Sequence, residues 1–147
     1  IRLSMGYPDH RSQINILRDR HSENPLDRVQ PVVTKDELLQ LIQEARTVEA
    51  NDRIFDYVTT LAEATRTHPM VELGVSPRGA LALCRMAKAH AFLAGRDFVV
   101  PEDVAAVFPD VCAHRLILSA KARMMEEKAE NILAEILKSV DMPVLKA

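Results

Sequence analysis

The segment Gly74-Val75-Ser76-Pro77-Arg78-Gly79 comes closest to a phosphate-binding loop. Its two glycines stand at the spacing of the Walker A loop, whose backbone N–H groups cradle phosphates. That loop also needs a Lys to reach the phosphates and a Ser or Thr to hold Mg²⁺, and Ala80-Leu81 stand in their places. The segment is therefore not a Walker A loop. We conclude that this chain alone lacks the machinery to hydrolyse a nucleotide.

Arg78 is nevertheless placed where a phosphate group could bind. Ser76 and Pro77 are typical of a helix start, which puts Arg78 in the first helical turn. Free backbone N–H groups, the positive end of the helix dipole and a guanidinium fork converge there. The alternative is that Arg78 is merely solvated at a helix start. Local physics favours this alternative, because a cation in the first turn opposes the helix dipole.

Arg85 and Lys88 lie on nearly the same face of the predicted helix as Arg78, so the three form a basic stripe. For Arg85 and Lys88 we favour the interpretation that they form the solvated side of a mostly buried helix. The alternative is contact with a nucleotide or a neighbouring subunit.

The remaining chemically active side chains show no functional spacing. The 5 histidines are scattered over different elements. Cys84 and Cys112 lie outside any C-x-x-C pattern, so a zinc site has no support. We expect both cysteines to be reduced, small buried side chains of a cytoplasmic protein. No nucleophile-elbow motif is present, which argues against hydrolase chemistry of the chain's own.

Composition narrows the fold and the partners. The 147 residues include 4 glycines and 4% aromatics, which favours one all-α domain over a strand-rich fold. The net charge of −2 offers no overall attraction to nucleic acid or acidic lipid. No apolar stretch approaches the ~20 residues of a membrane helix. We expect a cytoplasmic protein with neither a nucleic-acid nor a membrane partner, and we treat the chain, which begins at Ile1, as a fragment.

Start and stop signals divide the chain into helices that must position Arg78. Thr34 and Glu37 have capping-box spacing, and Pro109 is expected to interrupt the helix that Pro101 begins. Helices are predicted over about 34–48, 51–68, 76–94, 101–108 and 121–140, and a short one after the N-cap candidate Asp9. Strand pieces are at most short and lie near 32–33, 98–100 and 116–118, and the pattern over 110–118 fits a short helix as well as a strand.

Four stretches of the chain stand in a characteristic order and spacing. They are Gly6-Tyr7-Pro8, Val71-Glu72-Leu73-Gly74-Val75-Ser76-Pro77-Arg78-Gly79-Ala80-Leu81-Ala82-Leu83, Gly95-Arg96-Asp97-Phe98-Val99-Val100-Pro101-Glu102-Asp103-Val104 and His114-Arg115-Leu116. Across nearly the whole chain they strongly resemble the MoxR family of AAA+ ATPases. The resemblance implies a helical-bundle lid subdomain over 9–147, preceded by a remnant of the ATPase core and hinge over 1–8.

The resemblance also implies roles for particular residues. Ser76-Pro77-Arg78 looks like the sensor 2 motif, in which the Arg reaches the γ-phosphate of ATP bound in the core. This reverses the local interpretation of Arg78 and makes it the candidate catalytic residue. Gly6, Tyr7 and Pro8 would line the adenine side of the nucleotide, so that these residues and the Ser76-Pro77-Arg78 motif would together bind ATP.

Beyond the site, the resemblance implies an intact protein that uses ATP and Mg²⁺, with the Mg²⁺ ligands outside this chain, and a fragment that is inactive alone. It implies neighbouring subunits in a homo-oligomeric ring, expected to be a hexamer, chaperone-like remodelling of a partner complex, and a von Willebrand factor A domain protein as a candidate partner. Another class of function is a freestanding helical module that binds proteins without nucleotide chemistry. A third hypothesis, nucleic-acid binding, is disfavoured because the net charge is negative and few aromatic residues are available to stack on bases.

Overall fold

The computed structural model describes residues 1–19 and 24–144. The chain divides into two compact units, one formed by Leu3–Leu41 and a larger one formed by Ile1–Arg2 together with the chain from Ile42 onward. No described helix is both long enough and apolar enough to cross a membrane.

The smaller unit contains helix α1 (His10–Asp19), the 3₁₀ turn η1 (Pro25–Arg28) and the first turns of α2 (Lys35–Thr47). The Thr34 N–H and hydroxyl donate to the Glu37 carboxylate at 2.7 and 2.8 Å, and the Glu37 N–H donates to the Thr34 hydroxyl at 3.2 Å. This confirms the predicted capping box. The strand predicted near 32–33 is wrong: the chain bends there, and no described strand pairs with it.

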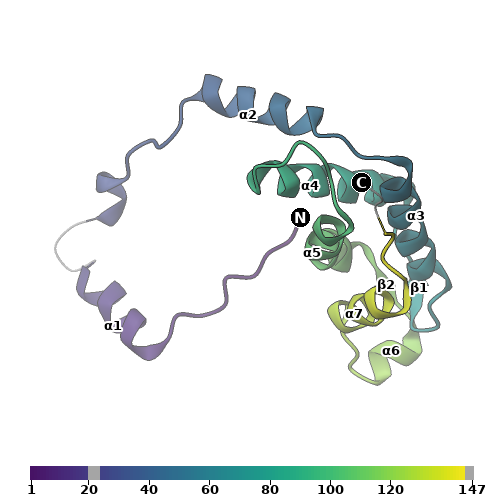
Figure 1. Ribbon diagram of the computed structural model, residues 1–147. Coiled ribbons are helices and arrows are strands. Elements are labelled where there is room, and N and C mark those ends of the chain that lie inside the picture. The colour runs from purple at the N-terminus through teal and green to yellow at the C-terminus, as the bar shows by residue number, and fades with distance from the viewer. Residues whose placement is uncertain (20–23, 145–147) are drawn as a thin grey trace. The chain divides into compact units, whose positions relative to one another are not determined.

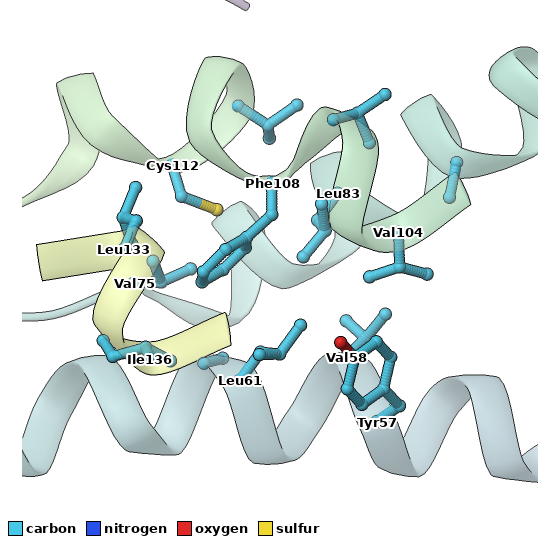
Figure 2. Packing of buried hydrophobic residues seen from close by; sticks show 14 of the residues in the cluster. Tyr57, Val58, Leu61, Val75, Leu83, Val104, Phe108, Cys112, Leu133 and Ile136 are labelled. Atoms are coloured by element: carbon cyan, nitrogen blue, oxygen red, sulfur yellow. The ribbon is translucent and has the colours of Figure 1, made fainter. Parts of the chain in front are cut away.

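The larger unit is a helical bundle around one hydrophobic core (Figure 1). Helices α3 (Asp52–Thr67), α4 (Pro77–Leu93), α5 (Pro101–Cys112) and α7 (Ala129–Ser139) supply most of it, and α5 packs most extensively on α4. Figure 2 shows Leu61 of α3, Phe108 of α5 and Ile136 of α7 directed into this core. The largest fully buried apolar side chains are Phe108, Ile54, Leu61, Leu83, Ile132, Leu133, Val75, Val104 and Val111.

Strand structure is confined to two short pieces among the described residues, so the predicted all-α class is confirmed. Strand β1 (Val71–Leu73) pairs antiparallel with β2 (Ile117–Leu118), with Val71 opposite Leu118. The piece predicted at 116–118 is thus present, whereas β1 was not predicted. Near 98–100 only Phe98 forms a bridge, a parallel one with Glu49.

Helix α5 continues through Pro109 to Cys112, which corrects the predicted interruption. A proline inside a helix removes one hydrogen bond and costs about 3 kcal/mol. The residues on both sides of Pro109 offset this cost, because Val107, Phe108, Val111 and Cys112 are all buried. Burying large apolar side chains contributes about 1.5–3 kcal/mol each. Burial of these side chains therefore stabilises the helical conformation through Pro109, where the proline alone predicts that the helix ends.

The helix predicted over about 121–140 is two helices, α6 (Ala120–Met124) and α7, and the predicted continuity is wrong. Glu126 has a left-handed φ of 54°. The Glu127 N–H donates to the Ala122 carbonyl at 2.9 Å, and the Glu126 N–H donates to the Arg123 carbonyl at 3.2 Å. These two bonds form a Schellman C-cap, which ends α6. The signal was hidden because glutamate, instead of glycine, takes the left-handed position.

Glu126→Gly is expected to stabilise the chain by about 1 kcal/mol. A left-handed backbone is strained for L-residues by roughly 1–2 kcal/mol, and glycine removes this strain at some cost in chain entropy. Urea unfolding measures the change. Glu126→Ala is the matched control, because it removes the carboxylate but keeps Cβ, and it should bring no gain. A Gly variant no more stable than the Ala variant would contradict this account.

Candidate functional site

The start of α4 presents Arg78 to solvent. The Ser76 hydroxyl accepts the Gly79 N–H at 3.2 Å, and Pro77 occupies the first helical position. Arg78 is exposed, and within the described residues its side chain makes no hydrogen bond and no ion pair. The structure thus leaves a guanidinium at a capped helix N-terminus, where free N–H groups and the helix dipole favour an anion.

The segment before this helix is held by the end of α3. Thr65, a fully buried residue, accepts the Val75 N–H at 2.8 Å through its hydroxyl, which donates to the Ala62 carbonyl at 2.6 Å. Arg66 donates through Nε to the Val75 carbonyl at 2.8 Å. Both backbone groups of Val75 are therefore paired with consecutive residues of α3.

Two glycines allow the close approach that this arrangement needs. A Cβ on Gly74 would lie 2.7 Å from the Arg66 Cα and N, which is closer than atoms can pack. A Cβ on Gly79 would lie 2.7 Å from Val75 Cγ1 and 3.4 Å from Cδ of Arg115. Arg115 donates through Nε to the Val111 carbonyl at 2.9 Å. The start of α4 is therefore packed against α3 on one side and against Arg115 on another.

Gly74→Ala is expected to destabilise the chain by about 1–3 kcal/mol, the usual range for overpacking a well-packed site. The added methyl group meets the backbone of α3, which cannot rotate away as a side chain can. Chemical denaturation measures the loss. If the midpoint of unfolding did not move, α3 and the α4 start would not be packed as tightly as the structure has them.

A second cluster of polar side chains ties α4 to α5, and it was not predicted from the sequence. Asp103, only 1% exposed, accepts hydrogen bonds from both terminal nitrogens of Arg96 at 2.5 and 2.7 Å. It also accepts the Val100 N–H at 2.8 Å and contacts Nδ1 of His90 at 2.7 Å. Burial opposes its charge, but the bonds from Arg96, Val100 and His90 outweigh burial and lower the pKa of Asp103 to about 2.

This cluster is structural, and one signal for it was available. Arg96 precedes and Asp103 follows the Phe98-Val99-Val100-Pro101 stretch, so a charge pair flanks an apolar run. The guanidinium of Arg96 also lies 6.0 Å from the centre of the Phe98 ring. No local pattern in the sequence shows that the Asp103 side chain is buried, so the cluster could not be predicted from this charge pair alone.

Lys88 donates to the Arg46 carbonyl at 3.4 Å, and exposed Arg85 shares a groove of about 580 Å³ with Phe55 and Leu81. Cys84 and Cys112 are both free, and burial raises the pKa of Cys112 to about 12. Cys112 is therefore an inert core thiol at neutral pH.

The family is shown by the segment that contains both the start of α4 and the Arg96–Asp103 cluster. Residues 63–136, more than half of the chain, match the family model described as the AAA lid domain. The chain belongs to the AAA lid domain family. The match spans the end of α3, all of α4 with Arg78, and the Arg96–Asp103 pair.

Relatives extend the likeness to nearly the whole chain. This lid is 36% identical to the uncharacterized protein YeaC of Bacillus subtilis and 29% identical to the chaperone MoxR1 of Mycobacterium tuberculosis, in each case over 99% of the chain. A solved structure from Cytophaga hutchinsonii, described as "a putative ATPase", matches 95% of the chain with a TM-score of 0.84 and 30% identity. The chain spans 46%, 41% and 45% of these three proteins. The lid is thus of the MoxR type, and it covers less than half of each of these relatives.

The other predicted site residues of the lid protein lie in the smaller unit. Gly6 has a φ of 64°, a left-handed conformation that suits glycine, and Tyr7 is fully exposed. Ser76, Pro77 and Arg78 lie together at the start of α4 in the larger unit. The adenine-side role of Gly6, Tyr7 and Pro8 stays a prediction.

Proposed function

We propose that the chain is the sensor 2 lid of a MoxR-like AAA+ ATPase and that Arg78 is the residue through which it acts on ATP. The observation that carries this proposal is the exposed, unpaired guanidinium of Arg78 at a helix start that α3 holds in place. Arg78 is held at a fixed position but has no partner among the described residues, so its guanidinium is available to a ligand from outside the chain.

The donors at this helix start fit a phosphate group. Arg78 offers a planar fork of N–H donors, and the adjacent first turn of α4 adds its dipole. The described residues contain no group of three or more His, Cys, Asp or Glu side chains that could hold a metal ion. We expect the residues that hold Mg²⁺ to belong to another part of the intact protein.

The chemistry divides between the nucleotide and the lid. Bound ATP supplies the phosphoryl group, and Mg²⁺ bound with it neutralises part of its charge. Arg78 adds a positive charge where negative charge develops on the phosphoryl oxygens, which lowers the barrier to attack by water. Loss of that phosphoryl group removes the partner of Arg78, so the lid can rotate after hydrolysis.

We infer that this rotation drives the work of the intact protein. The MoxR relationship supports a homo-oligomeric ring, which we propose to be a hexamer, with chaperone-like remodelling of a partner complex and a von Willebrand factor A domain protein as one candidate partner. We also propose a cytoplasmic location, because both cysteines are free.

The direct test is to read the coding sequence upstream of Ile1 and to assay the full-length protein. A phosphate-binding loop upstream, ATP turnover and a ring-sized mass by analytical ultracentrifugation are the expected results. An upstream sequence without that loop, together with a full-length protein that does not turn over ATP, would contradict the proposal. Those results would instead favour a helical module that binds proteins without nucleotide chemistry.

A further inference from the structure

Thr65 is a buried polar residue of α3 that lies outside the Ser76-Pro77-Arg78 motif. It lies in the last turn of α3 and is 0% exposed. A threonine near a helix end ordinarily returns its hydroxyl to its own helix, and Thr65 does so by donating to Ala62. The same oxygen also accepts the Val75 N–H, ten residues along the chain, at 2.8 Å. That second bond links α3 to the segment that leads into α4.

Val75 is the point through which Thr65 can act on Arg78. It immediately precedes Ser76, the cap of α4, and its side chain is 0% exposed and points into the core (Figure 2). Its carbonyl is bound by Arg66, so consecutive residues of α3 hold both of its backbone groups. Only Ser76 and Pro77 separate Val75 from Arg78, and proline has a fixed φ. The start of α4 therefore cannot shift unless these bonds to α3 break.

We propose that Thr65 is a positioning residue for Arg78. It sets the place of the guanidinium through the chain of contacts from its hydroxyl to Val75 and on to the Ser76 cap. The inference rests on the proposed role of Arg78 and adds to it a residue that touches no ligand. A displacement of about 1 Å at a catalytic group can cost as much as a hundredfold in rate, so a remote hydrogen bond is enough to matter.

The test uses the full-length protein and compares Thr65→Val with Thr65→Ser. Valine keeps the shape but leaves the Val75 N–H without its acceptor, whereas serine keeps the hydroxyl. We expect Thr65→Val to lower kcat for ATP hydrolysis about tenfold with little change in KM, within the limit for a misplaced group. Thr65→Ser should retain most of the activity. The control is Thr59→Val, which removes an exposed hydroxyl of α3 that bonds to the Phe55 carbonyl of the same helix, and it should leave kcat unchanged.

A double-mutant cycle separates positioning from a general structural effect. If Thr65 acts through Arg78, Thr65→Val should have no further effect on kcat once Arg78 is replaced by alanine. The same tenfold loss in both backgrounds would overturn the inference, and so would wild-type kcat in Thr65→Val. If Arg78→Ala alone leaves kcat intact, it is the proposed function that fails.

Arg66 provides a second route to the same test if Thr65→Val does not fold. Arg66 is exposed, and Arg66→Met removes its bond to the Val75 carbonyl while leaving the core untouched. We expect a loss of kcat that is smaller than that of Thr65→Val and that disappears in the Arg78→Ala background. An unchanged kcat in Arg66→Met, or an equal loss in both backgrounds, would overturn the inference.

Discussion

Arg78→Ala in the full-length protein is expected to lower kcat for ATP hydrolysis by about 10²–10³, the range for removing one preorganised donor from a transition state. The affinity for ATP should change far less. Arg78 stabilises charge that develops mainly as the phosphoryl group transfers, so its loss raises the barrier more than it weakens ground-state binding. Steady-state turnover, with ATP affinity measured separately by calorimetry, distinguishes the two effects.

The matched control for Arg78→Ala is Arg85→Ala, seven residues further along α4. Arg85 is also an exposed arginine of this helix, but it lies away from the capped N-terminus. Its removal should leave kcat within about twofold of the wild type, since surface substitutions away from a site have small effects. Unaltered hydrolysis in Arg78→Ala would defeat the sensor 2 role. A rise in KM with kcat unchanged would instead assign Arg78 to binding alone.

Helix starts were predictable because their signals are local. The hydroxyls of Thr34 and Ser76 and the amide oxygen of Asn51 each accept the backbone N–H three residues later. Pro77 adds to this signal, because the first helical position needs no N–H donor. The helices at 35, 52 and 77 accordingly begin within a residue of where the sequence places them. These helix-start signals depend on residues three or four positions apart, so they can be recognised without any knowledge of tertiary contacts.

Features that depend on distant partners were not predictable in this way. Val71–Leu73 becomes a strand because Ile117–Leu118 lies beside it, more than forty residues later in the chain. Pro109 stays helical because its neighbours are buried, and burial is a property of the assembled bundle. In each case a tertiary contact outweighs a local preference.

The candidate site shows the same limit. The sequence placed Arg78 in the first turn of a helix, yet local physics favoured a merely solvated side chain, and only the family resemblance supplied a role. Thr65 carried no signal, because a threonine in a helix has many ordinary uses. Its bond to Val75 emerges only when α3 and α4 pack. The sequence therefore indicates a residue that contacts a ligand, such as Arg78, more readily than a residue that positions it, such as Thr65.

Asp103→Asn is expected to destabilise the chain by about 2 kcal/mol at neutral pH. The substitution keeps the size of the side chain but removes the charge that Arg96 and His90 contact. Removing one partner of a fully buried pair costs about 3–5 kcal/mol. The cost here is lower, because Arg96 keeps 27% of its side chain exposed and can regain water. The matched control is Asp97→Asn, an exposed aspartate of the same connection, which should change stability by less than about 0.5 kcal/mol.

The pH dependence of stability tests the same carboxylate in the wild-type chain. Its pKa is lowered from 3.8 to about 2, so the folded state holds the charged form more tightly than the unfolded state does. That difference corresponds to about 2 kcal/mol, which is fully present above pH 3.8 and lost as the pH falls toward 2. The gap in unfolding free energy between wild type and Asp103→Asn should therefore be constant from pH 7 to about pH 5 and close below pH 3.8. A gap that stayed constant down to pH 2 would show that the effect of the asparagine substitution arises from packing, not from the lost charge.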